Sequence, residues 1–349
     1  MTKNYKSYHQ LLSILRSRGV IIKKGSVSSR VLKILEKENY YNVINGYKKL
    51  FIATPATTMA EEVYKVGTTF DEIFSLYQFD RELRQIYLRY ILKLETNFKS
   101  IVSHIFSKKY GHDNYLKLEN FHNTTSQNMS VLKRIAAQNK LDIKKDQSEI
   151  NRISAEENIA DVTQLIGDIQ QEIARQLNNH NEMVSHYMTV HGYIPLWVLV
   201  NVLTFGKVTT FFLHMKEPEK MVIAKQFSLQ YWELHKYMTM LGFARNKCAH
   251  DERFFDIRFS QRLHTKSIKN FSVLTLPRDK SGSYTRGICD AYAIAIIFKL
   301  LLNKQDFKEF YSSIETVFKK LSKQLTTISI VEVNEIMGYT QNWRNIIKL

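Results

Sequence analysis

Residues 244–255 contain the side chains of this sequence that are best suited to chemistry, in the order Ala-Arg-Asn-Lys-Cys-Ala-His-Asp-Glu-Arg-Phe-Phe. Four residues separate Arg245 from His250, and Asn246 directly follows the arginine. On an ideal helix Asn246 and His250 lie on one face, and the long side chain of Arg245 can reach the same side. A permanent cation, an amide and a titratable imidazole together favour an anionic substrate that exchanges protons, such as a phosphodiester. These three residues are therefore our candidate catalytic residues.

A second stretch repeats this spacing in a weaker form. Lys99 and His104 are also separated by four residues, but lysine cannot make the bidentate phosphate contact of arginine. Glu95 lies one helical turn before Lys99 and can pair with it. We keep Lys99 and His104 as a degenerate second half-site. For both stretches the alternative is a purely structural role. The basic side chain is then ion-paired or exposed, and the histidine caps the helix or lies on its polar face.

Basic residues are concentrated in two stretches of a chain whose formal net charge is +17. Residues 1–49 carry 11 Lys and Arg against 2 Asp and Glu, and residues 245–286 carry 10 against 4. An excess of this size favours a polyanionic partner, for which RNA is our expectation, over a merely solvated basic surface. The candidate RNA-binding residues are Lys23, Lys24, Lys48, Lys49, Arg253, Arg258 and Arg262.

The sequence gives little support for a metal centre. His180, His186 and His191 follow one another closely, but their spacing does not place them on one helical face. No carboxylate or thiolate joins them in a pattern of metal ligands. The two cysteines, Cys248 and Cys289, also lack ligand spacing and are too few for a disulfide scaffold. We expect neither a metal nor another cofactor.

No stretch of the sequence resembles a membrane span. The N-terminus lacks the apolar core of a signal peptide. The most apolar windows, 194–213 and 288–302, are interrupted by polar or charged residues and favour buried helices. We expect a cytoplasmic protein without a membrane partner.

Helices are the elements predicted to position the candidate residues. The 12 glycines and 4 prolines are too few for a turn-rich β fold. A helix capped by Ser228 is predicted to end at the 245–250 motif. Its apolar residues recur every three or four positions at Leu234, Met238, Leu241, Ala244 and Cys248. The longest predicted helix begins after Thr69, ends near Lys109 and carries the second half-site.

The expected fold class is all-α, with four parts, of which the helical core is divided into two segments. They are a basic helical region over residues 1–68 with a loop over 52–68, a helical core over 69–121 and 159–324, a polar insertion or linker over 122–158, and short C-terminal helices over 325–349. Within the core, residues 256–282 are predicted to be irregular, and helices are predicted from Ile159 and over 284–303.

Several segments carry a family resemblance, and they follow one another along most of the chain. They are Asn39-Tyr40-Tyr41 with Asn45-Gly46-Tyr47, Tyr77-x-Phe79-Asp80-Arg81-x-Leu83-Arg84 with Leu94-Glu95, Pro195-Leu196-Trp197 with Thr204-Phe205-Gly206, the 245–250 motif, and Met337-Gly338-Tyr339 with Asn342-Trp343-Arg344. Together these segments resemble the abortive-infection protein family typified by AbiD and AbiF of bacteria.

The resemblance implies a HEPN-like helical bundle with additional N-terminal and C-terminal helices, and a role in phage defence. HEPN nucleases join two Arg-x4-His motifs, whereas only the 245–250 motif is intact here. The second half of the site is then expected from a second subunit of a homodimer or from Lys99 and His104, unless activity is lost. Some AbiF-like members are linked to a small non-coding RNA, so this RNA, a target RNA or both are the expected partners.

Three hypotheses follow for the function. The leading one is metal-independent RNA cleavage that leaves 2′,3′-cyclic phosphate ends, with His250 as general base or acid, Arg245 on the phosphate and Asn246 as an orienting group. The second is a non-catalytic RNA-binding protein of a phage-defence or toxin–antitoxin-like ribonucleoprotein. The third is a protein-interaction scaffold with residues 122–160 as a mobile arm.

Overall fold

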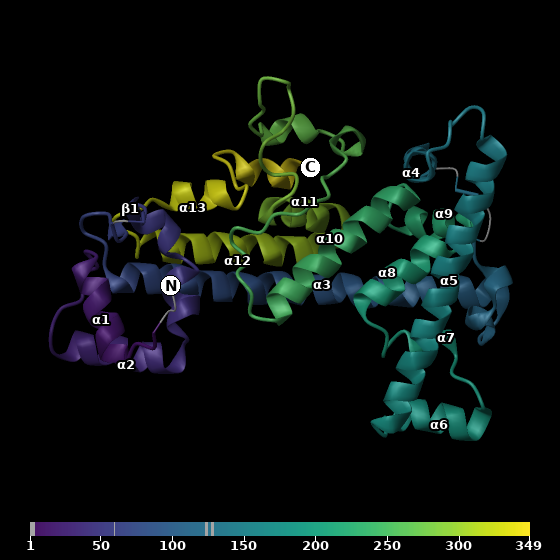
Figure 1. Ribbon diagram of the computed structural model, residues 1–349, viewed down its shortest axis with the longest axis horizontal. Coiled ribbons are helices and arrows are strands. Elements are labelled where there is room, and N and C mark those ends of the chain that lie inside the picture. Colours follow the sequence, from purple (N-terminus) through teal and green to yellow (C-terminus); the bar gives the residue numbers. More distant parts are fainter. Residues whose placement is uncertain (1–3, 59, 123–124, 127–128) are drawn as a thin grey trace. The chain divides into compact units, whose positions relative to one another are not determined.

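The computed structural model describes residues 4–58, 60–122, 125–126 and 129–349 (Figure 1). The remaining residues fall in the N-terminus, the expected 52–68 loop and the expected 122–158 insertion, and they lie outside the described residues. The fold is all-α except for one short pair of antiparallel strands in the described part of the chain, which confirms the predicted fold class.

The elements follow one another in a simple order along the chain. The first group is α1 (Tyr8–Ser17), α2 (Ser26–Lys37), a π-helical turn (Tyr41–Asn45), a 3-10 turn (Lys48–Phe51), β1 (Ile52–Thr54), β2 (Val63–Tyr64) and α3 (Phe70–Tyr110). The middle group is two 3-10 turns (Asn114–Leu116, Leu118–Asn120), α4 (Met129–Asn139), α5 (Gln147–Asn178), α6 (Glu182–His191), α7 (Leu196–Leu199), α8 (Phe205–His214), α9 (Glu217–Gln226) and α10 (Tyr231–Ala249). The last group is two 3-10 turns (Thr265–Ser267, Phe271–Leu274), α11 (Ala291–Leu301), α12 (Lys304–Ser322), α13 (Ile330–Ile336) and a 3-10 turn (Trp343–Lys348).

The chain forms two compact units. Unit 1 consists of Met1–Ile91 and Phe243–Leu349, and unit 2 consists of Leu92–Gly242. The boundaries fall within α3 and α10, so each of these helices contributes residues to both units. None of the helices in the described part of the chain is long and apolar enough to cross a membrane.

The core of unit 1 lies between the first turns of α3 and the C-terminal helices. Ion pairs of Lys320 with Glu82 and of Arg89 with Glu309 show that α12 runs antiparallel to α3. Between them the ring of Tyr87 meets that of Phe310 edge to face at 5.3 Å. Helix α11 is buried on all sides, which explains why its sequence is apolar all round.

Two elements of unit 1 differ from the sequence-based expectation. Helix α11 begins at Ala291 rather than near residue 284, because the side chain of Asp290 caps it by accepting the N–H of Ala293. Residues 52–68 were expected as a loop, but Ile52 pairs with Tyr64 in a short antiparallel ladder. Residues with high β propensity at both positions account for this pairing.

Unit 2 is organised around α5 and the part of α3 that follows Leu92. The rings of Phe106, Phe121 and Phe211 cluster with centroid distances of 4.9 to 5.5 Å and join α3 to α8. Helix α5 begins at Gln147, twelve residues before the predicted start. Its polar first turns bury only a narrow stripe against α4, and Ile150 packs there with Leu132, Ile135 and Ala136.

Helix α10 carries the apolar stripe that its sequence predicts. Leu234, Met238, Leu241, Ala244 and Cys248 are all buried. The predicted cap is wrong, because Ser228 has a left-handed backbone with φ of 56° and the helix begins three residues later. Glu233 instead accepts the N–H of Gln230 at 3.2 Å and caps the first turn.

Candidate functional site

The 245–250 motif lies at the C-terminal end of α10, where the helix closes with a Schellman turn. Asp251 adopts a left-handed conformation with φ of 56°, and the N–H of Glu252 returns to the carbonyl of Lys247 at 3.1 Å. The N–H of His250 still donates to the carbonyl of Asn246 at 3.0 Å. His250 is therefore the last residue held by the helix, and its side chain is exposed.

Asp251 occupies a position that usually belongs to glycine, and a buried arginine holds its carboxylate. Aspartate tolerates left-handed backbone better than most residues with a side chain, but still at a cost. Arg84 of α3 donates to Asp251 through Nη2, and Arg81 lies 4.0 Å from the same carboxylate. The side chain of Arg84 is 4% exposed. The residue directly after His250 is thus fixed to α3.

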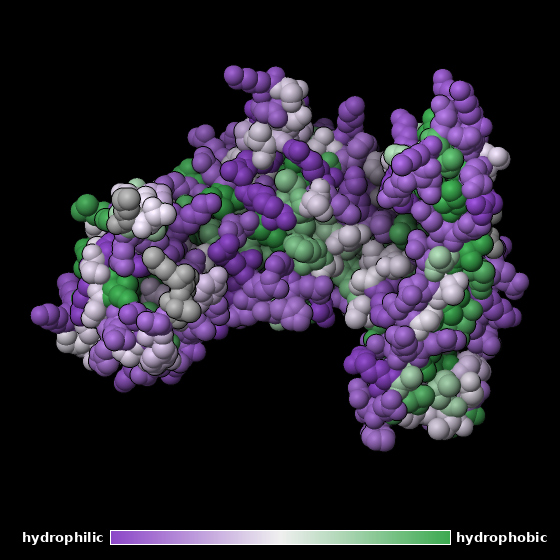
Figure 2. Space-filling view, viewed as in Figure 1, coloured by the Kyte–Doolittle hydropathy of each residue, from purple (hydrophilic) through white to green (hydrophobic). Residues whose placement is uncertain are grey.

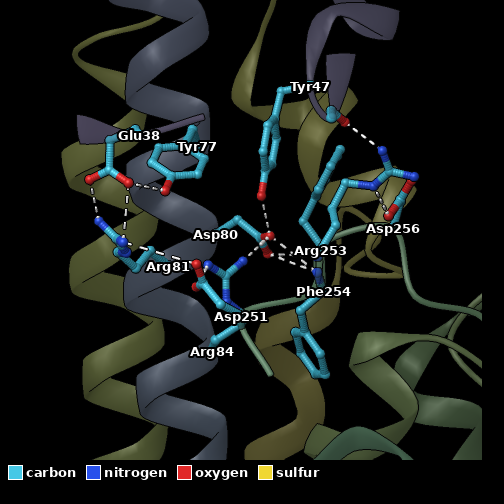
Figure 3. Close-up of polar contacts among 12 residues, drawn as sticks. Glu38, Tyr47, Tyr77, Asp80, Arg81, Arg84, Asp251, Arg253, Phe254 and Asp256 are labelled. Atoms are coloured by element: carbon cyan, nitrogen blue, oxygen red, sulfur yellow. Dashed lines mark hydrogen bonds and ion pairs between the residues drawn. The ribbon is translucent and has the colours of Figure 1, made fainter. Parts of the chain in front are cut away.

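The other half of the Arg84 guanidinium binds Asp80, which is fully buried (Figure 3). Asp80 accepts hydrogen bonds from Nη1 of Arg84 at 2.7 Å and from the hydroxyl of Tyr47 at 2.6 Å. It also accepts the backbone N–H groups of Phe254 at 3.1 Å and Phe255 at 2.7 Å. One carboxylate therefore ties the 3-10 segment near Tyr47 and the chain after α10 to the first unit's part of α3.

The electrostatics of this network favour a fixed structure over chemistry. Burial raises the pKa of Asp80, and the charge of Arg84 with the hydrogen bonds from Tyr47 and the two backbone groups opposes that rise. Burial and the neighbouring carboxylate also raise the pKa of Tyr47. Burial likewise raises the pKa of the Cys248 thiol, which makes Cys248 a poor nucleophile.

Two candidate catalytic side chains contact each other. Nη1 of Arg245 lies 3.5 Å from Oδ1 of Asn246, at the limit of a hydrogen bond. Asn246 is exposed and Arg245 is partly buried. Among the described residues, the imidazole of His250 has no hydrogen-bond partner. The motif thus offers an amide, a cation and an available imidazole on the last two turns of one helix.

The seven candidate RNA-binding residues all belong to unit 1, and the lysines among them differ in their surroundings. Lys23, Lys24 and Lys49 are exposed. Lys48 is partly buried, and its ammonium lies 2.6 Å from a carboxylate oxygen of Glu62. The first three are the better candidates for contact with phosphate.

The three arginines after α10 make structural hydrogen bonds while remaining exposed. Arg253 binds Asp256 at 2.7 Å and the carbonyl of Gly46 at 2.6 Å. Arg258 donates to the carbonyl of Ile336 at 2.7 Å, and Arg262 donates to that of Tyr284. Figure 2 shows a mainly hydrophilic surface over this irregular 256–286 segment. The guanidinium groups hold the segment in place through these hydrogen bonds, and their positive charge remains exposed at its surface.

The degenerate half-site belongs to unit 2. The predicted ion pair is present, with Nζ of Lys99 2.8 Å from Glu95, and the same ammonium donates to the carbonyl of Leu203 at 2.7 Å. His104 is exposed. Both Lys99 and His104 line a cleft of about 820 Å³. The nearby carboxylate offsets the charge of Lys99 and weakens it as a phosphate ligand.

The histidines of α6 do not form a metal site in the structure. The rings of His186 and His191 lie 5.8 Å apart. Across the described residues, no group of three or more His, Cys, Asp or Glu side chains is arranged to hold a metal ion.

The buried network that holds the chain after His250 is not predicted from the sequence. Asp80 and Arg84 stand one helical turn apart and are both charged, which is a signal for an ion pair within α3. Their link to Asp251 depends on tertiary packing, so no spacing in the sequence indicates it.

Comparison with known proteins identifies the family. A family model described as Abi-like protein matches residues 33–256, which is more than half of the chain. The matched range contains the Asp80–Arg84 pair and the 245–250 motif with Asp251. Searches of curated proteins and of solved structures found no match. The chain therefore belongs to the Abi-like family of abortive-infection proteins, and this membership indicates a role in phage defence.

Proposed function

We propose that the protein is a cytoplasmic, HEPN-type ribonuclease of a phage-defence system that cleaves RNA without a metal ion. The observation that carries the proposal is the available imidazole of His250 at a helix end that Arg84 and Asp251 anchor. Such an anchor lets a catalytic side chain keep its position without ligand-induced ordering. Membership of an abortive-infection family supports a function that harms phage or host RNA.

The proposed reaction uses the internal nucleophile of RNA. His250 accepts the proton of a ribose 2′-OH, and the oxygen attacks the adjacent phosphorus. The bond from phosphorus to the 5′-oxygen breaks, a proton passes to that oxygen, and a 2′,3′-cyclic phosphate and a 5′-hydroxyl remain. Arg245 neutralises the charge that develops on the phosphate, and Asn246 orients the phosphate or the imidazole. General acid–base catalysis of this kind contributes about 10²–10⁴-fold.

One imidazole supplies either the base or the acid, so a complete site requires a second group. The ion pair of Lys99 with Glu95 favours a second copy of the chain as the source of this group over Lys99 and His104. We therefore propose a homodimer in which two 245–250 motifs meet. A rate per chain that rises with protein concentration, together with dimers in sedimentation velocity, is the expected result. A fully active monomer contradicts it.

The proposal is tested with purified protein and labelled RNA in EDTA. His250→Ala is expected to slow cleavage by about 100-fold or more, with products of the wild type identified by mass spectrometry as 2′,3′-cyclic phosphates. His9→Ala changes an exposed histidine outside the motif and serves as the matched control. Cleavage of DNA that depends on a metal, or unchanged cleavage by the His250 variant, contradicts the proposal.

The second candidate function is non-catalytic RNA binding, which the partly neutralised second half-site favours. Exposed Lys23, Lys24 and Lys49 then hold a small non-coding RNA, and the motif has no chemical role. Sequencing RNA that co-purifies with the native protein identifies this partner under either hypothesis. Unchanged phage defence by His250→Ala, with full RNA retention, decides for the binding protein.

A further inference from the structure

A cleft in unit 2 combines aromatic, hydroxyl and basic side chains. It has a volume of about 820 Å³ and lies between the unit 2 part of α3 and the residues from α7 to Asn201. Its lining includes Thr96, Ser100 and Ser103, together with His104 and Lys108. The volume is within the range of sites that hold a nucleotide-sized ligand.

Trp197 is the most unusual residue of this cleft. It lines the cleft and is 50% exposed, whereas its neighbours Leu196, Val198 and Leu199 in α7 are buried. The short helix thus uses its apolar residues for the core and leaves the indole at the surface. Large aromatic side chains gain free energy when they are covered, so an exposed indole in a concave site favours a ligand that stacks on it.

A cluster of further rings lies on the segments that follow α3 and precede α7. The ring of Tyr193 lies 4.6 Å from that of His112 and 6.3 Å from that of His191. Tyr187 and His186 extend the cluster, with ring centroids 5.5 and 5.8 Å from that of His191. The backbone of the cleft helix joins it directly, because the N–H of Leu196 donates to the carbonyl of His112 at 3.0 Å. We call these five rings the ring cluster.

We propose that this cleft binds a nucleotide of single-stranded RNA, with its base stacked on Trp197 and neighbouring bases on the ring cluster. This inference rests on the proposed function in one respect, which is the choice of RNA as the ligand. Hydroxyl groups and Asn201 match the polar edges of bases and the ribose, and Lys108 matches a phosphate. Bases reach such rings only when they are unpaired, so single-stranded RNA is preferred over duplex RNA.

This assignment gives Lys99 and His104 a role in binding instead of cleavage. Two of the three donors of the Lys99 ammonium are used by Glu95 and the carbonyl of Leu203. Lys99 and His104, whose imidazole is exposed, both line the cleft. They fit hydrogen bonding to RNA groups better than general acid–base chemistry, for which a compensated ammonium is a poor partner.

The test measures binding of a short fluorescein-labelled 2′-O-methyl oligouridine, which cannot undergo the internal 2′-OH attack. In fluorescence anisotropy Trp197→Ala is expected to weaken binding about tenfold or more, because one base stack is lost. Trp197→Phe keeps a ring and is expected to retain most of the affinity. Trp232→Ala is the matched control, since Trp232 is 41% exposed and does not line the cleft. Duplex RNA is expected to bind independently of Trp197.

A second measurement covers the case in which Trp197→Ala does not fold. Wild-type protein is photocrosslinked to single-stranded RNA containing 4-thiouridine, and crosslinked peptides are expected to include Trp197 or Tyr193. Crosslinks confined to other segments, or equal losses for the Trp197 and Trp232 variants, overturn the inference. The inference is also overturned if Trp197→Ala leaves the affinity for RNA unchanged but abolishes co-elution of a partner protein. RNA cleavage by the His250→Ala variant is measured in a separate experiment. A failure of the proposed ribonuclease function can therefore be distinguished from a failure of RNA binding in the cleft.

Discussion

At the scale of single residues, Arg84 has the largest energetic role near the motif. Its guanidinium is almost fully buried between Asp80 and Asp251. Replacing it leaves the Asp80 carboxylate buried without its counter-charge, which costs several kcal/mol in proteins. Four donors surround Asp80, so the three that remain lessen this cost but do not remove it.

We predict that Arg84→Ala lowers the free energy of unfolding by about 3–5 kcal/mol, measured by urea denaturation. Arg81→Ala is the matched control one turn away on α3. Arg81 is 41% exposed and pairs with the partly exposed Glu38, so its loss is expected to cost at most about 1 kcal/mol. Similar effects of the two changes contradict the assigned role of the buried guanidinium.

A change at Asp251 tests the stability of the fold and the positioning of His250 separately. Asp251→Gly relieves the left-handed backbone but removes the contact of Arg84 with the chain beside His250. We predict a stability change within about 1 kcal/mol, because the two effects oppose each other. RNA cleavage is expected to fall by roughly 10- to 100-fold in kcat, as for a misplaced catalytic group.

Asp251→Asn is the conservative comparison, since asparagine also accepts the left-handed backbone and keeps a hydrogen-bond acceptor. It is expected to recover part of the activity that the glycine variant loses. If the glycine variant cleaves RNA as fast as the wild type, then the Arg84–Asp251 contact is structural only.

At the scale of elements, the sequence predicts helices better than their ends. The stripe of α10 is predicted correctly because the 3.6-residue period alone decides which of Leu234, Met238 and Leu241 are buried. Helix α3 begins after Thr69 as predicted, and the hydroxyl of Thr69 accepts the N–H of Glu72 at 3.1 Å. The start of α10 is missed because Ser228 takes a left-handed turn instead of a cap.

The candidate site is predictable only in part, because the sequence indicates local helical geometry but not long-range packing. Arg245, Asn246 and His250 are close in sequence, so helical geometry alone suggests their association. The Asp80–Arg84–Asp251 network joins segments far apart in the chain, and only packing brings them together.

The elements of unit 2 also contain histidines that are held neutral. Burial, Lys220 and His214 lower the pKa of His235 on α10 to about 4. Burial is also the main cause that lowers the pKa of His214 on α8. In the unfolded chain a histidine titrates near pH 6.5. Below that pH the unfolded state takes up protons that the folded state refuses, so acid favours unfolding.

We predict that the free energy of unfolding falls between about pH 6.5 and pH 4, with His235 contributing up to about 3 kcal/mol. His235→Gln is expected to flatten this dependence in urea denaturation at pH 7 and pH 5. His9→Gln, which changes an exposed histidine, is expected to leave the slope unchanged. An unaltered slope for the His235 variant contradicts the prediction.

At the scale of the whole molecule, the net charge of +17 would govern the attraction to the RNA partner that we propose. Charge that is already paired within the fold adds little to this attraction, because a carboxylate a few ångströms away cancels its field. The structure therefore distinguishes basic residues that the composition treats alike. Lys48 is paired with Glu62, whereas Lys23 and Lys49 are exposed.

We predict that the logarithm of the RNA association constant falls linearly with the logarithm of salt concentration, as counterions are released from the phosphates. Each of Lys23→Ala, Lys24→Ala and Lys49→Ala is expected to reduce this slope by about 0.7, the value for one phosphate of a single strand. Lys48→Ala is the matched control and is expected to leave the slope unchanged, because its ammonium lies 2.6 Å from Glu62. If all four variants change the slope equally, charge alone governs RNA binding and ion pairing within the fold does not select the contacts.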